Sequence, residues 1–401
     1  MNNDLNLPRR PGLIRGLLIA ASVAAMAALA PGAYAQQQAK LRVGLMLPYT
    51  GTYAALGTAI TNGFQLAVAE QDGKLGGREI ELYRVDDESD PAKATENTNR
   101  LIKRDRVDVL VGTVHSGVAI GMAKVARQTN TLMINPNAGA DEITGPLCAP
   151  NIFRTSFSNW QPGYATGKVM ADSTHKTAVT LTWRYAAGQQ MVEGFKEAFA
   201  KGGGKVLREM YLPFPNVEFQ PFLTEIAALK PEAVFVFFAG GGAVKFVKDY
   251  AAAGLKDNIP LYGTGFLTDG TLEAQGATAQ GIVTALHYAD SLDTPRDNAF
   301  RTAYRKAYNM EPDVYAVQGY DAGQLLRIGL ESVQGDLKKR DQMIRAMRAA
   351  KIDSPRGVFT LSSAHNPVQD FYVRRVEGKE NKSIGIAVKA LADPARGCKM
   401  P

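Results

Sequence analysis

The chain has 401 residues, of which 45% are hydrophobic and 21% are charged, and its formal net charge at pH 7 is +7. The composition is that of a globular protein, and the length exceeds what one ordinary core organises. Basic residues are scattered among acidic ones without interleaved aromatic residues, so nucleic-acid binding is not expected. Four histidines and two cysteines form no ligand cluster of the zinc type, and we predict neither a metal nor another cofactor.

Residues 1–35 have the pattern of a cleaved export signal. Three arginines precede an apolar stretch over residues 17–30, and the small-residue sequence Ala-Tyr-Ala at 33–35 suits signal cleavage. The apolar stretch is shorter than the ~20 residues that span a bilayer, and no cysteine follows it to carry a lipid. The sequence therefore predicts a periplasmic protein without a membrane anchor, with a retained N-terminal anchor as the alternative.

Strand-like and helix-like segments alternate regularly from residue 40 onward. In the first part, strands are predicted at 41–47, 79–85, 107–111 and 131–134, with helices at 55–71, at 91–103 and up to 128. This order predicts a parallel, doubly wound α/β sheet. The acidic segment 86–90 is interpreted as a solvated loop in which Asp90 caps the helix starting at Pro91, with a metal site as the alternative.

A second series of elements begins near residue 176. Strands are predicted at 176–183, 205–211, 233–238, 260–262 and 281–286, helices at 189–201, 243–253, 296–308, 314–332 and 339–349, and final strands at 357–361, 369–376 and 383–388. We predict two lobes with doubly wound parallel sheets: 40–155 plus 287–356, and 156–286 plus 357–390, followed by a C-terminal tail at 391–401. The chain then crosses between the lobes near Thr155, His287 and Arg356, and three crossings make a hinge.

The exit of the strand at 107–111 is the strongest candidate for a ligand site. It places His115 and Ser116 at the carboxyl edge of the sheet, where open α/β sheets bind ligands. Unpaired amides at the start of the next helix carry the positive end of its dipole, so they suit a carboxylate. The neighbouring strand ends in a second polar turn, Asn137-Ala138-Gly139, and the two strand exits together would form one binding surface for the ligand carboxylate. The alternatives are that Ser116 only caps the helix and that His115 is a turn residue.

No catalytic arrangement accompanies this site. The sequence contains no G-x-S-x-G elbow, P-loop or G-x-G-x-x-G motif, and the adjacent side chains of His115 and Ser116 point apart and cannot form a nucleophile and base pair. The glycine run at 240–242, which includes Gly241, is either a tight turn or a place where a ligand approaches the backbone. A binding protein is therefore favoured over an enzyme.

Cys148 and Cys398 are the two cysteines of the chain. An even pair in an exported protein predicts a disulfide, with two unpaired thiols as the alternative. The bridge would hold the C-terminal tail against the body of the protein. In the chain-entropy model a loop of this size contributes at most about 5 kcal/mol of stability.

Several short motifs follow one another in a characteristic order: Val43-Gly44-Leu45, Thr50-Gly51, Asn62-Gly63, Gly76-Gly77-Arg78, Asp86-Asp87, Asp90-Pro91, Val111-Gly112 and Asn135-Pro136. In this order they resemble the type I solute-binding proteins of ABC importers, specifically the branched-chain amino acid (leucine/isoleucine/valine) receptor family, over nearly all of the mature chain. The resemblance implies a monomeric, two-lobed Venus-flytrap receptor that serves the transmembrane subunits of an ABC permease. It also implies that Ser116 and residues 137–139 hold the ligand carboxylate and that Tyr315 covers the ligand.

One departure from the family bears on the ligand. The amino acid receptors pair the ligand ammonium with an acidic residue after a second-lobe strand, and Gly265 stands at the matching position. A buried ammonium without a counter-charge costs several kcal/mol, so an amino acid is disfavoured unless Asp269 or Asp290 reaches the site. Aromatic residues instead lie near the predicted element ends that face the gap between the lobes: Tyr53, Trp183, Tyr185, Phe266, Tyr288 and Tyr315.

The sequence therefore resembles the branch of the family that binds aromatic carboxylates, such as benzoate-like or phenylpropanoid acids. The alternatives are a receptor for branched-chain or other amino acids or amides, and a ligand sensor that serves a signalling partner. A secreted enzyme is the least favoured.

Overall fold

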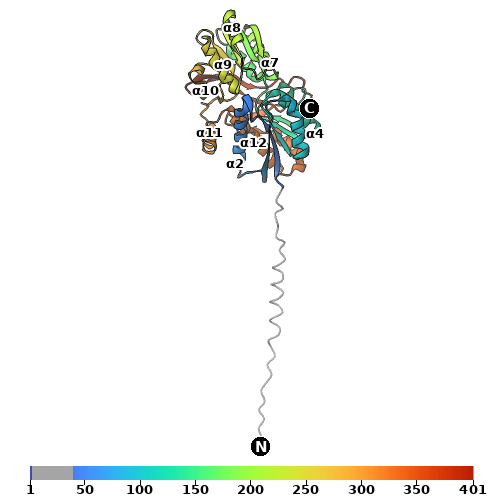
Figure 1. Cartoon of the computed structure of the whole chain (residues 1–401). Helices are drawn as coiled ribbons and strands as arrows, with labels where there is room; N and C mark the ends of the chain where they lie inside the picture. Colours follow the sequence, from blue (N-terminus) through green and yellow to red (C-terminus); the bar gives the residue numbers. More distant parts are fainter. Residues whose placement is uncertain (2–38, 401) are drawn as a thin grey trace. The chain divides into compact units, whose positions relative to one another are not determined.

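Two β-sheets covered by helices organise the chain from Lys40 onward (Figure 1). The structure is a computed structural model that describes Met1 and residues 39–400. The predicted export signal therefore lies, apart from Met1, outside the described residues. Among the helices of the described part, none combines the length and the apolar character needed to cross a bilayer.

The first sheet has the strand order β2-β3-β1-β4-β5-β6. Its strands are β1 (Leu41–Leu47), β2 (Lys74–Leu75), β3 (Arg78–Asp86), β4 (Val109–Val111), β5 (Leu132–Asn135) and β6 (Ile152–Arg154). The four predicted strands β3, β1, β4 and β5 pair in parallel, as predicted. Two further strands were not predicted: β6, which pairs in parallel with β5, and the short β2, which pairs antiparallel with β3. β4 and β5 are buried throughout, because helices cover both faces of such a sheet.

The three helices predicted in this part are present as α2 (Ala54–Ala69), α3 (Pro91–Asn99) and α4 (Ser116–Thr129). Two short elements were not predicted: η2 (Gly51–Tyr53) and α5 (Asp141–Thr144). The Asp90 carboxylate accepts a hydrogen bond from the amide of Ala92 at 2.9 Å and so caps α3. α3 ends four residues earlier than predicted, because the chain continues as the π-helical turn η3 (Arg100–Arg104).

The second sheet has the strand order β12-β13-β14-β11-β10-β9-β7-β8, with β15 beside β14. Its strands are β7 (Thr177–Trp183), β8 (Lys205–Leu212), β9 (Ala233–Phe237), β10 (Leu261–Thr264), β11 (Val283–Leu286), β12 (Lys351–Ile352), β13 (Phe359–Leu361), β14 (Pro367–Glu377) and β15 (Glu380–Leu391). β7 to β11 pair in parallel, whereas β14 pairs antiparallel with β11, β13 and β15. The predicted parallel set is thus present from β7 to β11, and the final strands, for which no direction was predicted, make the sheet mixed. The two residues between β14 and β15 are too few for a parallel crossover.

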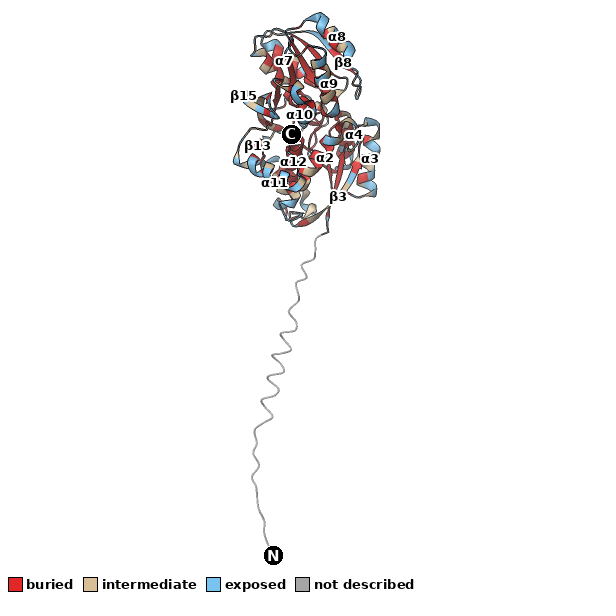
Figure 2. Ribbon diagram, turned by 60° about the vertical axis from the view of Figure 1, so that its left-hand side comes forward, coloured by how far each residue is buried: buried red, intermediate tan, exposed pale blue. Residues whose placement is uncertain are grey.

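Helices of the second part pack on this sheet: α6 (Trp160–Ala171), α7 (Ala186–Lys201), α8 (Gln220–Leu229), α9 (Gly240–Ala252) and the short α10 (Leu272–Gln275), η4 (Gly265–Leu267) and η5 (Gly276–Ala279). α6 and α8 were not predicted from the sequence. Figure 2 shows that buried residues concentrate in the strands and on the inner faces of the helices, with exposed residues on the outer faces of α3 and α8.

The last helices return to the first sheet. They are α11 (Pro295–Tyr308), α12 (Val314–Ser332) and α13 (Arg340–Arg348), preceded by the turn η6 (Leu337–Lys339). α12 crosses α2 at glycines on both helices: a Cβ added to Gly63 would lie 1.9 Å from the carbonyl oxygen of Ala316, and one added to Gly319 would lie 2.0 Å from that of Ile60. The two backbones therefore touch, and α12 completes the core of the first lobe.

A buried arginine joins two of the segments that run between the lobes. The Arg356 guanidinium donates hydrogen bonds to the carbonyl oxygens of Thr155 and Ser156, and its Nε lies 3.1 Å from the carboxylate of Asp321 on α12. Burial lowers the pKa of Arg356 to about 10 and raises the pKa of Asp321 to about 6. Because each buried charge has its partner, the segments near residues 155 and 356 are held side by side.

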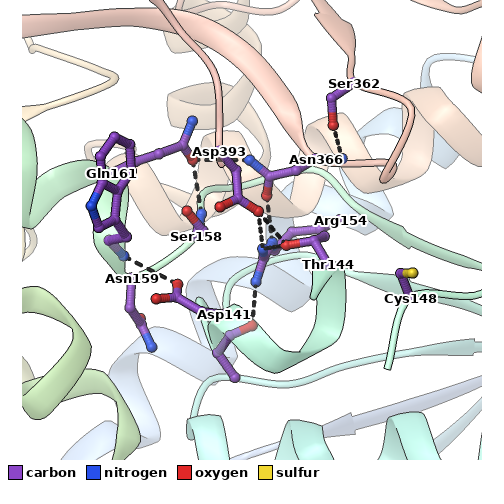
Figure 3. Close-up of polar contacts among 12 residues, drawn as sticks. Asp141, Thr144, Cys148, Arg154, Ser158, Asn159, Gln161, Ser362, Asn366 and Asp393 are labelled. Atoms are coloured by element: carbon purple, nitrogen blue, oxygen red, sulfur yellow. Dashed lines mark hydrogen bonds and ion pairs between the residues drawn. The ribbon is translucent and has the colours of Figure 1, made fainter. Parts of the chain in front are cut away.

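The C-terminal tail returns from the second sheet to the first lobe. Cys398 forms the expected disulfide with Cys148. Ahead of it, the Asp393 carboxylate accepts a hydrogen bond from Thr144 at 2.5 Å and lies 3.8 Å from the guanidinium of Arg154 (Figure 3). Since β15 lies in the second sheet, the tail adds a fourth connection between the lobes, and the disulfide closes it.

The glycine crossing predicts a packing defect. Gly319→Ala should lower the free energy of unfolding in urea by about 1 to 3 kcal/mol, because the added methyl group forces α2 and α12 apart. Gly241→Ala is the control, since a Cβ there meets only the hydroxyl oxygen of Thr52, at 3.5 Å. Equal stabilities of the two variants would contradict this account of the crossing.

Candidate ligand-binding site

A cavity lies where the carboxyl ends of the two sets of parallel strands face each other. The room for the centres of water-sized molecules inside it is about 20 Å³. The cavity is therefore narrow in this structure, and its lining residues define the candidate site. Among the described residues that line it there is no aspartate, glutamate, lysine or arginine. A charged ligand must therefore be held there by hydroxyl, amide and helix-end groups.

The polar end of the cavity is formed by Ser116, Asn137, Gly139 and Asn159. Ser116 is the first residue of α4, and the side-chain amide of Asn159 donates a hydrogen bond to its hydroxyl oxygen at 3.2 Å. Because that oxygen already accepts a hydrogen bond, the Ser116 hydroxyl hydrogen is left for another acceptor. An anion at the start of α4 is such an acceptor, and the helix dipole favours it.

Aromatic rings form most of the remaining wall. Phe266 lies at its centre, with ring centroids 4.7 Å from Phe157, 6.1 Å from Tyr315 and 6.3 Å from Phe237. The Tyr315 hydroxyl is buried and has no hydrogen-bond partner among the described residues. Burial raises the pKa of Tyr315 well above its usual value, so the hydroxyl keeps its proton and can donate it. A buried donor without an acceptor is costly, which makes it a second candidate contact for an anion.

The lobes are in contact around this cavity. The hydroxyl groups of Tyr53, in η2, and Tyr185, at the start of α7, are hydrogen-bonded at 2.8 Å. The amide of Gly242 donates a hydrogen bond to the Thr52 hydroxyl at 3.2 Å. Gly240 has a φ of +55°, and a Cβ added to it would lie 2.3 Å from the Thr52 carbonyl oxygen, so only glycine fits there. The glycine run thus serves the approach of the lobes, and the structure is of a closed form.

Seven of the eleven residues predicted to bind ligand line the cavity: Tyr53, Ser116, Asn137, Gly139, Tyr185, Phe266 and Tyr315. Four do not: His115, Ala138, Trp183 and Gly241. The structure gives each of the four another position. Gly241 belongs to the run that faces Thr52, and the amide of Ala138 donates to the carbonyl oxygen of Thr113 at 2.9 Å, which removes that amide from the predicted binding surface.

Trp183 and His115 support the lining from behind. The Trp183 indole donates to the carbonyl oxygen of Asn216 at 2.9 Å and its ring packs edge-on against Tyr53 at 5.9 Å. The His115 ring stacks on Tyr185 across the lobes at 4.4 Å, and its Nδ1 accepts a hydrogen bond from the amide of Gly117. Tyr288, also named among the aromatic residues, is buried and donates to Asp297.

Sequence reasoning missed Phe157, Asn159, Met191 and Phe237, which all line the cavity. Phe237 ends β9, so its position at a carboxyl strand end was a usable signal. Met191 lies one turn after Ala187 on α7, and helical spacing from the strand exit would have identified it. Phe157 and Asn159 lie between β6 and α6, where no element was predicted.

The two carboxylates that were considered as ammonium partners are engaged elsewhere. Asp269 is buried with its carboxylate 2.6 Å from the guanidinium of Arg374, and Asp290 accepts a hydrogen bond from the amide of Asn381 at 2.8 Å. Arg374 also fills the space beside Gly265, where a Cβ would lie 2.4 Å from its Nη2. No side chain can therefore extend from position 265 without displacing that arginine.

Two α/β lobes closed over one small cavity at their strand ends are the architecture of a ligand-binding protein with a hinge. The chain belongs to the periplasmic binding protein family, which residues 40–382 match. Proteins of this family bind solutes in the periplasm.

Relatives and solved structures agree with this assignment. The Leu/Ile/Val-binding protein homolog 6 of Brucella melitensis biotype 1 is 28% identical over 362 residues, which cover 88% of this chain and 92% of the relative. A solute-binding protein of an ABC transporter from R. palustris, solved in complex with benzoate, is 56% identical with a TM-score of 0.88, covering 90% of this chain and 99% of that one. Another, from Rhodopseudomonas palustris BisB5 in complex with 3,4-dihydroxybenzoic acid, is 33% identical with a TM-score of 0.84, covering 88% and 99%.

The stacked histidine predicts a pH dependence of stability. Burial lowers the pKa of His115 to about 4, and the opposing effect of Asp90 is smaller. In the unfolded chain a histidine titrates near its usual value of about 6.5, so on acidification the unfolded state binds a proton that the folded state does not. The contribution of His115 is therefore complete above about pH 6.5 and is lost as the pH falls toward about 4.

Urea unfolding of the wild type and of His115→Phe between about pH 7 and about pH 5 checks this sign. The wild type should lose more free energy of unfolding over this range than the variant, by about 2 kcal/mol at pH 5. Phenylalanine keeps the ring stack without a titrating group. Parallel pH profiles would show that His115 is not held neutral by the fold.

Proposed function

We propose that this chain is a periplasmic receptor that binds a small aromatic carboxylate between its lobes and delivers it to an ABC importer. One observation carries the proposal: the cavity is walled by aromatic rings and contains no charged side chain, but offers the hydroxyl groups of Ser116 and Tyr315. Such a site holds a flat ring and a carboxylate, and it has no partner for an ammonium group.

The energetics permit this ligand. Hydrogen bonds to a charged group contribute about 1.5 to 3 kcal/mol each, and burial of a ring of ~150 Å² contributes about 4 kcal/mol at 25 cal/mol per Å². Two or three such bonds together with the ring, less the cost of ordering, reach roughly the 8 kcal/mol of a micromolar ligand.

The neighbouring structures support the same ligand class. The R. palustris protein at 56% identity was solved with benzoate, and the BisB5 protein with 3,4-dihydroxybenzoic acid. The Leu/Ile/Val-binding relatives favour an amino acid as the alternative, at 28% identity. The pairing of Asp269 with Arg374 favours the aromatic acid, because an amino acid would bury its ammonium group without a counter-charge.

The proposal includes a working cycle. The exported chain, after loss of residues 1–35, acts as a monomer without a membrane anchor. Ligand docks on lobe 1 (40–155 plus 287–356), and lobe 2 (156–286 plus 357–390) swings over it about the three hinge segments. The permease then recognises the closed form, because the ligand has stabilised it relative to the open one.

Titration calorimetry of the mature protein tests the ligand class. Benzoate and hydroxybenzoates should bind with roughly micromolar dissociation constants, and leucine or valine should give no heat of binding. Binding of leucine or valine without binding of the ring acids would reverse the choice of ligand.

Ser116→Ala tests the polar end of the cavity. The variant should weaken benzoate binding by about 1 to 3 kcal/mol, because the carboxylate loses a hydroxyl donor, while the melting temperature of the ligand-free protein changes little. Ser332→Ala on α12 is the matched control, since its hydroxyl donates to the carbonyl oxygen of Gly329 and lies outside the cavity lining. An unchanged affinity in Ser116→Ala would remove Ser116 from the site.

A further inference from the structure

Gln190 is a lobe 2 side chain whose amide group contacts lobe 1 on both of its polar atoms. It lies on α7, half-buried, one residue before the cavity-lining Met191. Its Oε1 accepts a hydrogen bond from the backbone amide of Asp141 at 3.1 Å, and its Nε2 donates to the Glu142 carboxylate at 2.9 Å. Asp141 and Glu142 belong to α5, which follows the Asn137–Gly139 turn of the first lobe.

The same glutamine is connected to the ligand cavity. The side-chain amide of Asn159 donates to Gln190 Oε1 at 2.8 Å and to the Ser116 hydroxyl oxygen at 3.2 Å. The backbone of Asn159 is fixed as well, because its amide donates to the carbonyl oxygen of Gly139 at 2.6 Å. A continuous chain of hydrogen bonds therefore runs from Ser116 through Asn159 to Gln190.

We propose that Gln190 is a positioning residue that latches the closed form and couples closure to the occupation of the Ser116 end of the cavity. When lobe 2 swings away, the contacts of Gln190 with Asp141 and Glu142 must break, so they stabilise only the closed form. A ligand binds with an apparent affinity that scales with the fraction of competent, closed protein, and the latch raises that fraction.

The link to Ser116 gives the latch its sensitivity to ligand. An anion that accepts the Ser116 hydroxyl hydrogen fixes the rotation of that hydroxyl and directs its lone pairs toward the amide of Asn159. Asn159 Nδ2 donates to both oxygens, so a fixed Ser116 hydroxyl holds the Asn159 amide in the orientation in which its second hydrogen points at Gln190 Oε1. The coupling is therefore positional: the occupied cavity orients Asn159, and Asn159 orients Gln190. The latch rests on the proposed function only for the identity of the ligand.

The chemistry of this contact requires a neutral amide at position 190. Gln190→Glu would place a carboxylate 2.9 Å from that of Glu142, where the structure has a donor and an acceptor. Like charges at this distance repel, so the substitution should open the lobes. In the double variant Gln190→Glu with Glu142→Gln, donor and acceptor exchange places, and the new glutamate still accepts from Asp141 and Asn159.

Two measurements on the mature protein test the latch. The first is the closed fraction without ligand, from single-molecule energy transfer between dyes at the exposed positions Lys103→Cys and Lys230→Cys in the two lobes. The second is the dissociation constant for benzoate. Gln190→Ala should lower the closed fraction and weaken benzoate about tenfold. Gln189→Ala, at an exposed position on the same helix, should match the wild type in both.

Charge exchange separates a latch from general destabilisation. Gln190→Glu should weaken benzoate more than Gln190→Ala does, and the double variant with Glu142→Gln should restore most of the loss, which a merely structural defect would not allow. If Gln190→Ala equals Gln189→Ala in closed fraction and in affinity, or if the exchange restores nothing, the latch is overturned. If the wild type fails to bind benzoate but Gln190→Ala still lowers the closed fraction, the proposed ligand is wrong and the latch stands.

Discussion

Under the proposed function the cavity holds an anion with no cationic side chain among its described lining residues, and the rest of the site follows from that constraint. Hydroxyl hydrogens and the amide end of α4 have to replace a counter-charge, so they must be dry and held in place. Asn159 directs the Ser116 hydroxyl from the hinge side, and the buried rings of Phe157, Phe266 and Tyr315 exclude water from the ligand. Both effects require the lobes to be closed.

The backbone of the site was predictable because it depends on local patterns. The buried run before Gly112 predicts a parallel strand, and the position of Ser116 at the carboxyl end of β4 follows from the topology alone. The same holds for Asn137 and Gly139 after β5. The absence of a carboxylate at position 265 was also visible in the sequence. The structure supplies its physical reason, since the guanidinium of Arg374, 109 residues away, occupies that space.

The sequence could not predict which side chains near the strand ends face the cavity and which pack behind its lining. Trp183 is the last residue of β7 and Tyr185 follows two residues later, but only Tyr185 reaches the cavity, while Trp183 packs against Tyr53. The backbone amide of Ala138 was expected to face the ligand. It donates a hydrogen bond to the carbonyl oxygen of Thr113 at the neighbouring strand exit instead. Phe157 and Asn159 lie in a stretch without periodicity, and their roles depend on partners in both lobes. The antiparallel end of the second sheet escaped the pattern for a different reason, since alternation marks a strand but not its direction.

The interleaved connectivity has a consequence for the order in which the two lobes can fold. The strands of the first sheet come early in the chain. α12, whose backbone touches α2 at Gly63 and Gly319, begins at Val314, 162 residues after the start of β6 at Ile152. The second sheet likewise waits for β14 and β15. Cys148 must remain unpaired until Cys398 arrives, 250 residues further along. Neither core can therefore be completed before the C-terminal residues are present, and for a chain that is exported as proposed this means folding after transport.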